Sequence, residues 1–212
     1  MAKARSRREA NLRQHIAFLA ARLMAEDGGL DYGAAKSKAA RQAGLGDAKL
    51  LPDNQEIEAA LREYQELYQS DDQPAQLRHL REVAVKVMRD FAAFRPVLVG
   101  SVLSGTAGQH SDVNLQLFTD DEKALTMFLL NHRYRFESGT RRVRRGDRTE
   151  EVPQVRIEVD DVEVALTVLH PDEERVSAKA REGEAPQRAR IAEVEAMLQA
   201  ADEPRDERSA GA

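Results

Sequence analysis

The sequence predicts an α+β fold, in which an all-helical N-terminal part leads into a small mixed sheet and a C-terminal helix. Three observations support this. Apolar residues recur at three- and four-residue steps before Pro96, they alternate at two-residue steps after it, and helical spacing returns near the C-terminus. A chain of 212 residues has room for one or two compact regions of this kind.

Four helices are expected before Pro96. The first shows a single apolar stripe, made by Leu12, Ile16, Leu19 and Leu23. The second spans residues 32–43. Asp53 can cap the third helix, and Glu56, three residues later, can complete a capping box. The fourth begins near Pro74, because proline is favoured at the first position of a helix, and it ends before Pro96.

Strands are expected after Pro96. VLVGSVL contains a short apolar run, and VNLQLF alternates strictly. Thr119 then caps a helix, with Glu122 at the matching position of a capping box. The segments RYRF, RRVRR and VRIEV follow as strands, separated by Gly139 and by a turn at Gly146, and VEVALTVL alternates again. Pro186 is expected to open the last helix.

These elements divide the chain into four parts. We expect a helical N-terminal region over residues 1–73 and an α/β core over 74–170. A linker and the C-terminal helix occupy 171–201, and the tail 202–212 has the composition of a disordered segment.

Composition excludes several classes of protein. The chain has 32 Lys plus Arg against 37 Asp plus Glu and no cysteine. Disulfides, thiolate metal sites and a cysteine nucleophile are therefore excluded, so that any metal must be held by oxygen or imidazole. The N-terminus lacks the features of a signal peptide, and no run of about 18 apolar residues is present. We expect a cytoplasmic protein with no membrane partner.

The stretch VGSVLSGTAGQHSDVNLQLF carries the chemistry. A Gly-Ser turn that leads into a helix start exposes backbone N–H groups to which phosphate oxygens can bind, and glycine lets the phosphate approach closely. Asp112 and Asn114 are two residues apart on a strand and therefore face the same side. Adjacent oxygen donors of this kind suit a hard cation such as Mg²⁺.

This pattern resembles the nucleotidyltransferase fold of the DNA polymerase β-like superfamily, and in particular a small proteobacterial family. The resemblance covers roughly residues 75–170. The residues that match in type and spacing are Gly100, Ser101, Gly105, Ser111 and Asp112. It implies phosphate binding by the first four residues and metal binding by Asp112. The chemistry that it implies is transfer of a nucleotidyl group from ATP or another nucleoside triphosphate to a hydroxyl, with two Mg²⁺ ions held by three carboxylates.

The sequence departs from this family pattern at two of the three carboxylate positions. Asn114 stands at the second position and Ala165 at the third. The candidate substitutes are Glu163, two positions before Ala165 on the same face, and Glu158 on the preceding strand, although the spacing of neither fits well. The resemblance therefore favours a degenerate member of the superfamily that binds a nucleotide, an RNA or a protein partner. The alternative is an active Mg²⁺-dependent nucleotidyltransferase.

Two further features are candidates for phosphate contacts. His110 precedes the Ser-Asp pair and can act as a phosphate ligand or a general base, or it is simply a solvent-exposed loop residue. Seven arginines and two acids lie between residues 133 and 148, and Arg141 and Arg142 can extend the site toward a nucleic acid or a triphosphate. The alternative is that these arginines pair with the nine acids of residues 149–174.

Overall fold

The computed structural model describes residues 2–26, 30, 32–44, 51–68, 73–108, 111–145, 148–174 and 188–202. These residues belong to two compact units. The first consists of Met1–Gln76 and Thr106–Ser111, and the second of Leu77–Gly105 and Asp112–Ala212. Helices dominate the first unit and a mixed sheet the second, so the predicted α+β fold class is confirmed.

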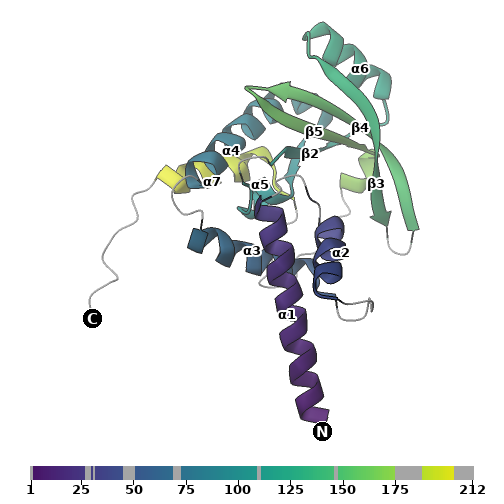
Figure 1. The fold of residues 1–212 in the computed structure, drawn as a ribbon. Helices are drawn as coiled ribbons and strands as arrows, with labels where there is room; N and C mark the ends of the chain where they lie inside the picture. Colours follow the sequence, from purple (N-terminus) through teal and green to yellow (C-terminus); the bar gives the residue numbers. More distant parts are fainter. Residues whose placement is uncertain are drawn as a thin grey trace. The chain divides into compact units, whose positions relative to one another are not determined.

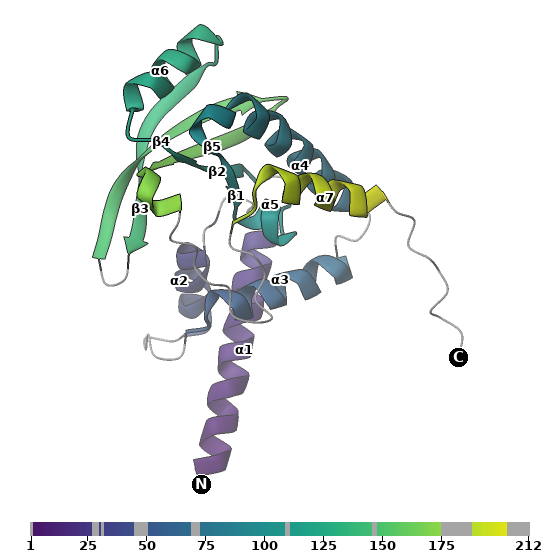
Figure 2. The same cartoon turned by 180° about the vertical axis from the view of Figure 1, so that it is seen from behind.

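The first unit contains α1 (Ala2–Glu26), α2 (Tyr32–Gln42), α3 (Asn54–Tyr68) and the start of α4 (Gln73–Asp90). Both α2 and α3 contact α1, and Figures 1 and 2 show them beside its C-terminal half. The buried side chains of this core are Ile16, Ala17, Ala20, Leu23, Ala35, Ala39 and Ile57. The apolar stripe predicted for the first helix therefore faces this core.

A capping box begins α3, as the sequence predicts. The Glu56 N–H donates to Asp53 Oδ1 at 2.9 Å, and the Asp53 N–H donates to Glu56 Oε2 at 2.7 Å. This exchange satisfies two backbone donors that have no partner within the helix. Arg13 Nε on α1 also donates to Glu56 Oε1 at 2.7 Å, so the same carboxylate joins the two helices.

The second unit is built on a five-stranded sheet with the order β1-β2-β5-β4-β3. The bounds of the strands are β1 Val97–Val99, β2 Val113–Phe118, β3 Phe136–Arg145, β4 Arg148–Val159 and β5 Val162–Leu169. Strands β2 and β5 pair in parallel, and the other neighbours pair antiparallel. The hairpin β3–β4 extends past β5, because β4 pairs with β5 only from Gln154 onward.

Helices α4 and α7 (Ile191–Asp202) lie along one side of this sheet, as Figure 2 shows. Short helices α5 (Ser101–Ser104), η2 (Ala92–Phe94) and η3 (Pro171–Glu174) and the longer α6 (Glu122–Asn131) complete the described part of the unit. Leu98, Leu115, Leu166 and Val194 are fully buried. None of the helices in the described residues combines the length and hydrophobicity needed to span a bilayer.

The structure corrects three details of the expected elements. Of the expected strand RYRF, only Phe136 belongs to a strand, because Arg133 adopts a left-handed φ of 59° in the turn after α6 and β3 begins at Phe136. Strand β3 runs through Gly139 without a break, because Gly139 pairs with Gln154 in a ladder whose tertiary pairing outweighs the weak strand preference of glycine. Asp121, and not Thr119, is the N-cap of α6. Its side chain accepts from the Ala124 N–H at 2.8 Å, while the Thr119 hydroxyl accepts from the Asp121 N–H one step earlier.

Two other expectations fall on parts of the chain that are not described. The turn expected at Gly146 and the helix start expected at Pro186 lie outside the described residues. Helix α7 itself is present and starts at Ile191.

Candidate functional site

The Gly100–Ser101 turn has the conformation that the motif requires. Strand β1 ends at Val99, Gly100 has φ 79° and ψ −156°, and α5 begins at Ser101. This combination of angles is essentially restricted to glycine. Gly105 ends α5 with φ 84°, and its N–H donates to the Ser101 carbonyl. The predicted sequence of strand, turn and short helix is therefore confirmed.

Asp112 and Asn114 flank Val113 at the start of β2. Val113 is fully buried, whereas its two neighbours are half-buried on the opposite face. Asn114 lies beside the Gly100 turn, since a Cβ added to Gly100 would lie 3.8 Å from the Asn114 Cβ. Asn114 Nδ2 also donates to the Asp112 carbonyl at 3.3 Å. The turn after β1 and the first residues of β2 thus form one local site.

The strand register brings the two non-acidic positions together. Asn114 on β2 and Ala165 on β5 are direct register partners in the parallel pair. Ala165 is 4% exposed. Two of the three positions at which the resemblance expects carboxylates therefore lie side by side, and neither carries a negative charge.

Asp112 and Glu163 influence each other electrostatically. Val113 pairs with Val164, so Asp112 and Glu163 precede register partners on neighbouring parallel strands. Partial burial raises the pKa of the Asp112 carboxyl, the negative charge of Glu163 raises it further, and the positive charge of Arg156 lowers it. Glu158 and Glu163 are the two candidate substitutes for the missing carboxylates. Of these, Glu163 is the one whose charge raises the pKa of Asp112.

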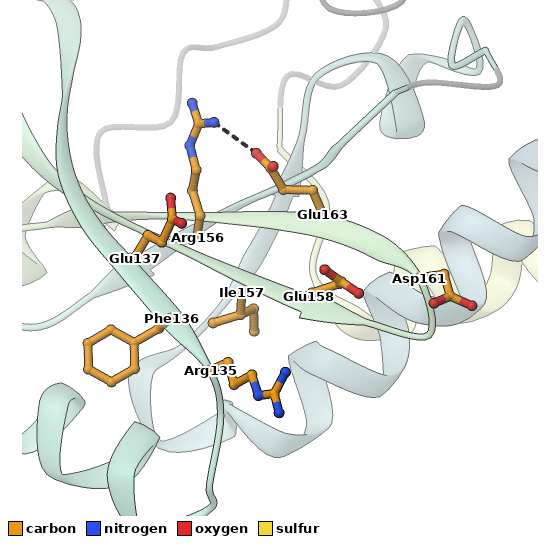
Figure 3. A pocket seen from close by; sticks show the side chains of 8 residues that line it. All are labelled: Arg135, Phe136, Glu137, Arg156, Ile157, Glu158, Asp161 and Glu163. Atoms are coloured by element: carbon orange, nitrogen blue, oxygen red, sulfur yellow. Dashed lines mark ion pairs between the residues drawn. The ribbon is translucent and has the colours of Figure 1, made fainter.

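Two arginines contact the side chains beside Asp112. Arg141 on β3 donates from Nη1 to Asn114 Oδ1 at 3.1 Å. Arg156 on β4 forms an ion pair with Glu163, with Nη1 and Oε1 3.0 Å apart, and Figure 3 shows this contact as a dashed line. Asn114 and Glu163, two of the side chains considered as partners of Asp112 in holding a cation, therefore already have guanidinium partners.

A pocket of about 470 Å³ adjoins the Arg156–Glu163 pair. The residues that line it are Arg135, Phe136, Glu137, Arg156, Ile157, Glu158, Asp161 and Glu163. In Figure 3 the Arg156–Glu163 contact lies at one side, and Asp161 lies near the turn between β4 and β5. Arg156 is not among the residues expected from the sequence, although its two-residue spacing from Glu158 in VRIEV places both on one face of the strand.

Glu158 and Arg142 are the remaining acidic and basic residues selected from the sequence. Glu158 is exposed and is the register partner of Glu163. Arg142 follows Arg141 on β3 and therefore faces the opposite side of the strand. Its Nε lies 3.3 Å from Glu151 Oε1 on β4. This is the pairing with acidic neighbours that the sequence offered as the alternative to phosphate binding.

Ser111 and His110 precede β2. The Ser111 hydroxyl accepts from the Gly108 N–H at 3.0 Å, and the Ser111 N–H donates to the Gly108 carbonyl at 3.1 Å. These bonds lie within the first unit. His110 lies outside the described residues.

The donor set does not fit a two-magnesium centre. Magnesium ions need concentrated negative charge from oxygen ligands, and only Asp112 among the three expected positions supplies it. The amide oxygen of Asn114 accepts from Arg141, and the carboxylate of Glu163 is paired with Arg156. Among the described residues, no group of three or more acidic or histidine side chains is placed to hold a metal ion.

Comparisons with protein-family models, with curated proteins and with solved structures found no match.

Proposed function

We propose that the second unit is a degenerate nucleotidyltransferase-like module that binds the phosphate groups of a nucleotide, with arginines in the place of metal ions. One observation carries this proposal. Arg141 donates to Asn114, and Arg156 forms an ion pair with Glu163, so that each of these two side chains beside Asp112 has an arginine partner. Positive charge is thus present where the resemblance expects Mg²⁺, and it is supplied by side chains.

The chemistry of guanidinium supports a phosphate ligand. A guanidinium is planar, remains protonated, and presents several N–H donors in a geometry that matches two phosphate oxygens. The amide of Asn114 is neutral, so Arg141 can release it for an anionic ligand without leaving an unpaired carboxylate. Gly100 brings a backbone without a side chain next to Asn114, which leaves room for a phosphate at that position.

The alternative function is an active Mg²⁺-dependent nucleotidyltransferase. The observation in its favour is the mutual influence of Asp112 and Glu163, which places two carboxylates on adjacent parallel strands. Catalysis by this pair would require the ligand or the metal to displace Arg156 from Glu163.

Calorimetric titration of ATP into the 212-residue protein, in buffer with Mg²⁺ and in buffer with EDTA, tests the proposal. We expect binding in both buffers. The Arg141→Gln variant should bind about tenfold more weakly, since a hydrogen bond to a charged group contributes about 1.5 kcal/mol or more. Arg89→Gln is the matched control, because Arg89 is paired with Glu195 in the helical layer of the same unit.

Two results would contradict the proposal. If ATP does not bind in either buffer, the site is not a nucleotide site. If ATP binds only with Mg²⁺, and pyrophosphate release is observed and is abolished by Asp112→Asn, the active enzyme is the correct description.

A further inference from the structure

The segment Thr106–Ser111 joins the two halves of the motif, yet it packs in the helical unit. Gly105 precedes the segment and Asp112 follows it, and both of these residues belong to the second unit. Thr106 and Ala107 are 3% and 0% exposed. A connecting loop normally lies on the surface, because a buried loop must find partners for its backbone polar groups. The burial of this one therefore needs specific hydrogen bonds.

Glutamine side chains of the first unit supply these bonds. Gln65 on α3 is 5% exposed, and its Nε2 donates to the Thr106 carbonyl at 2.9 Å, across 41 positions of sequence. Gln73 Nε2 at the start of α4 donates to the Ala107 carbonyl at 3.3 Å. Tyr32 on α2 is half-buried and shares a side-chain hydrogen bond with Thr106. Three helices thus hold two consecutive residues.

The identity of residue 65 follows from this contact. The neighbouring buried positions of α3, Ile57 and Leu61, are apolar. An apolar residue at position 65 would suit the helical core equally well, but it would leave the Thr106 carbonyl buried without this donor. A buried polar side chain that bonds to a distant backbone group restricts that group to one conformation. The hydrogen bond to Thr106 therefore explains a glutamine at position 65 better than packing in the helical core does.

We infer that Gln65 is a positioning residue, and that one role of the helical unit is to fix the segment that connects Gly105 to Asp112. The segment has only six residues, and Ser111 closes its end through two hydrogen bonds to Gly108. Because few bonds of the chain separate Thr106 from Asp112, a shift of Thr106 should displace Asp112 and Asn114 as well. An effect of Gln65 on ligand affinity rests on the function proposed above. Its effect on the position of Thr106 is independent of that function.

The variant Gln65→Met tests this inference, because methionine has a similar length and no donor. Gln42→Leu is the control, since Gln42 is exposed on α2. We expect faster hydrogen exchange of the backbone amides of residues 106–111 in Gln65→Met, by about tenfold or more, and no change in the control. The two-dimensional NMR signals of the Asp112 backbone and the Asn114 side-chain amide should shift in Gln65→Met alone. Gln73→Met should act in the same direction with a smaller effect.

The outcomes separate this inference from the proposed function. Unchanged exchange in residues 106–111 would show that the Gln65 bond does not hold the segment and would overturn the inference. Faster exchange with unchanged Asp112 and Asn114 signals would overturn the coupling to the site. If both change while the wild-type protein binds no ATP, the inference stands and the nucleotide proposal fails. If wild type binds ATP, the affinity of Gln65→Met should fall about fivefold.

Discussion

The two faces of strands β2 and β5 carry different kinds of side chain. On one face Leu115 and Leu166 are register partners, and both are 0% exposed. On the other face the neighbouring pair is Asn114 and Ala165, next to Asp112. The first face supplies the apolar burial that stabilises any sheet covered by helices. The second face also carries the polar side chains of Asp112, Asn114 and Glu163, which apolar burial does not explain, so information about function is concentrated there.

The largest expected effect lies on the buried face. Leu166→Ala should lower the free energy of unfolding by about 3 kcal/mol, because it removes apolar contacts and leaves a cavity in a close-packed region. Urea denaturation followed by circular dichroism measures this loss. Leu130→Ala on α6 is the control, because Leu130 is 56% exposed. Equal losses in the two variants would contradict the assignment of this face as the core.

The second largest loss of stability is expected at the Gly100 turn, which lies beside Asn114 on the polar face. Gly100→Ala should cost about 2 kcal/mol, because its φ of 79° and ψ of −156° strain any residue with a Cβ. The nearest atom to the added Cβ is 3.8 Å away, so the cost is conformational and not a clash. Gly139→Ala is the control, since a Cβ there meets nothing within 4 Å. A neutral Gly100→Ala would show that this turn adopts another conformation in solution.

Asp112→Asn should stabilise the protein slightly at neutral pH. The folded-state pKa of Asp112 lies above its ordinary value of 3.8, so the ionised carboxylate weakens the fold above the folded-state pKa. This cost disappears as the pH falls toward 3.8. The gain at pH 7 should be below about 1 kcal/mol, since solvent screens a half-exposed group.

The pH dependence gives the test of this third prediction. Thermal melts of wild type and Asp112→Asn should differ most at neutral pH and converge as the pH is lowered. Asp120→Asn, at an exposed position before α6, is the control. A difference that grows in acid would contradict the raised pKa of Asp112.

The smallest expected effect is that of Glu163→Gln. The Arg156–Glu163 pair is about half exposed, with side chains 54% and 45% accessible. Its loss should change the free energy of unfolding by less than about 0.5 kcal/mol. The pKa of Asp112 should nevertheless fall, because the charge of Glu163 contributes to raising it. An NMR titration of the Asp112 carboxyl measures this shift, and an unchanged pKa would argue against an electrostatic interaction between the two groups.

The features that the sequence predicted well depend on short-range signals. The capping box at Asp53 and Glu56 acts over three residues, and the Gly100–Ser101 turn is a local backbone requirement. The error at α6 shows the limit of such signals. Thr119 and Asp121 are both good N-caps, and only the path of the chain out of β2 decides that Asp121 bonds to Ala124.

The contacts that define the site come from distant parts of the chain. Arg141 is 27 residues from Asn114, and Gln65 is 41 residues from Thr106. The sequence offered several arginines between residues 133 and 148, with no signal to show which one reaches β2. The β3–β4 register decides this choice, since it places Arg141 and Arg142 on opposite faces.

The sequence alone determined the α+β class, the Gly-Ser turn and the non-acidic residues at positions 114 and 165, because periodicity and residue identity are properties of the chain itself. Only the tertiary structure decided which arginines lie beside positions 114 and 165. It also decided which helices bond to Thr106 and Ala107, in the segment before Asp112. The physical reason is that strand register and long-range hydrogen bonds are selected by the packing of the whole fold, and local residue patterns do not encode that packing.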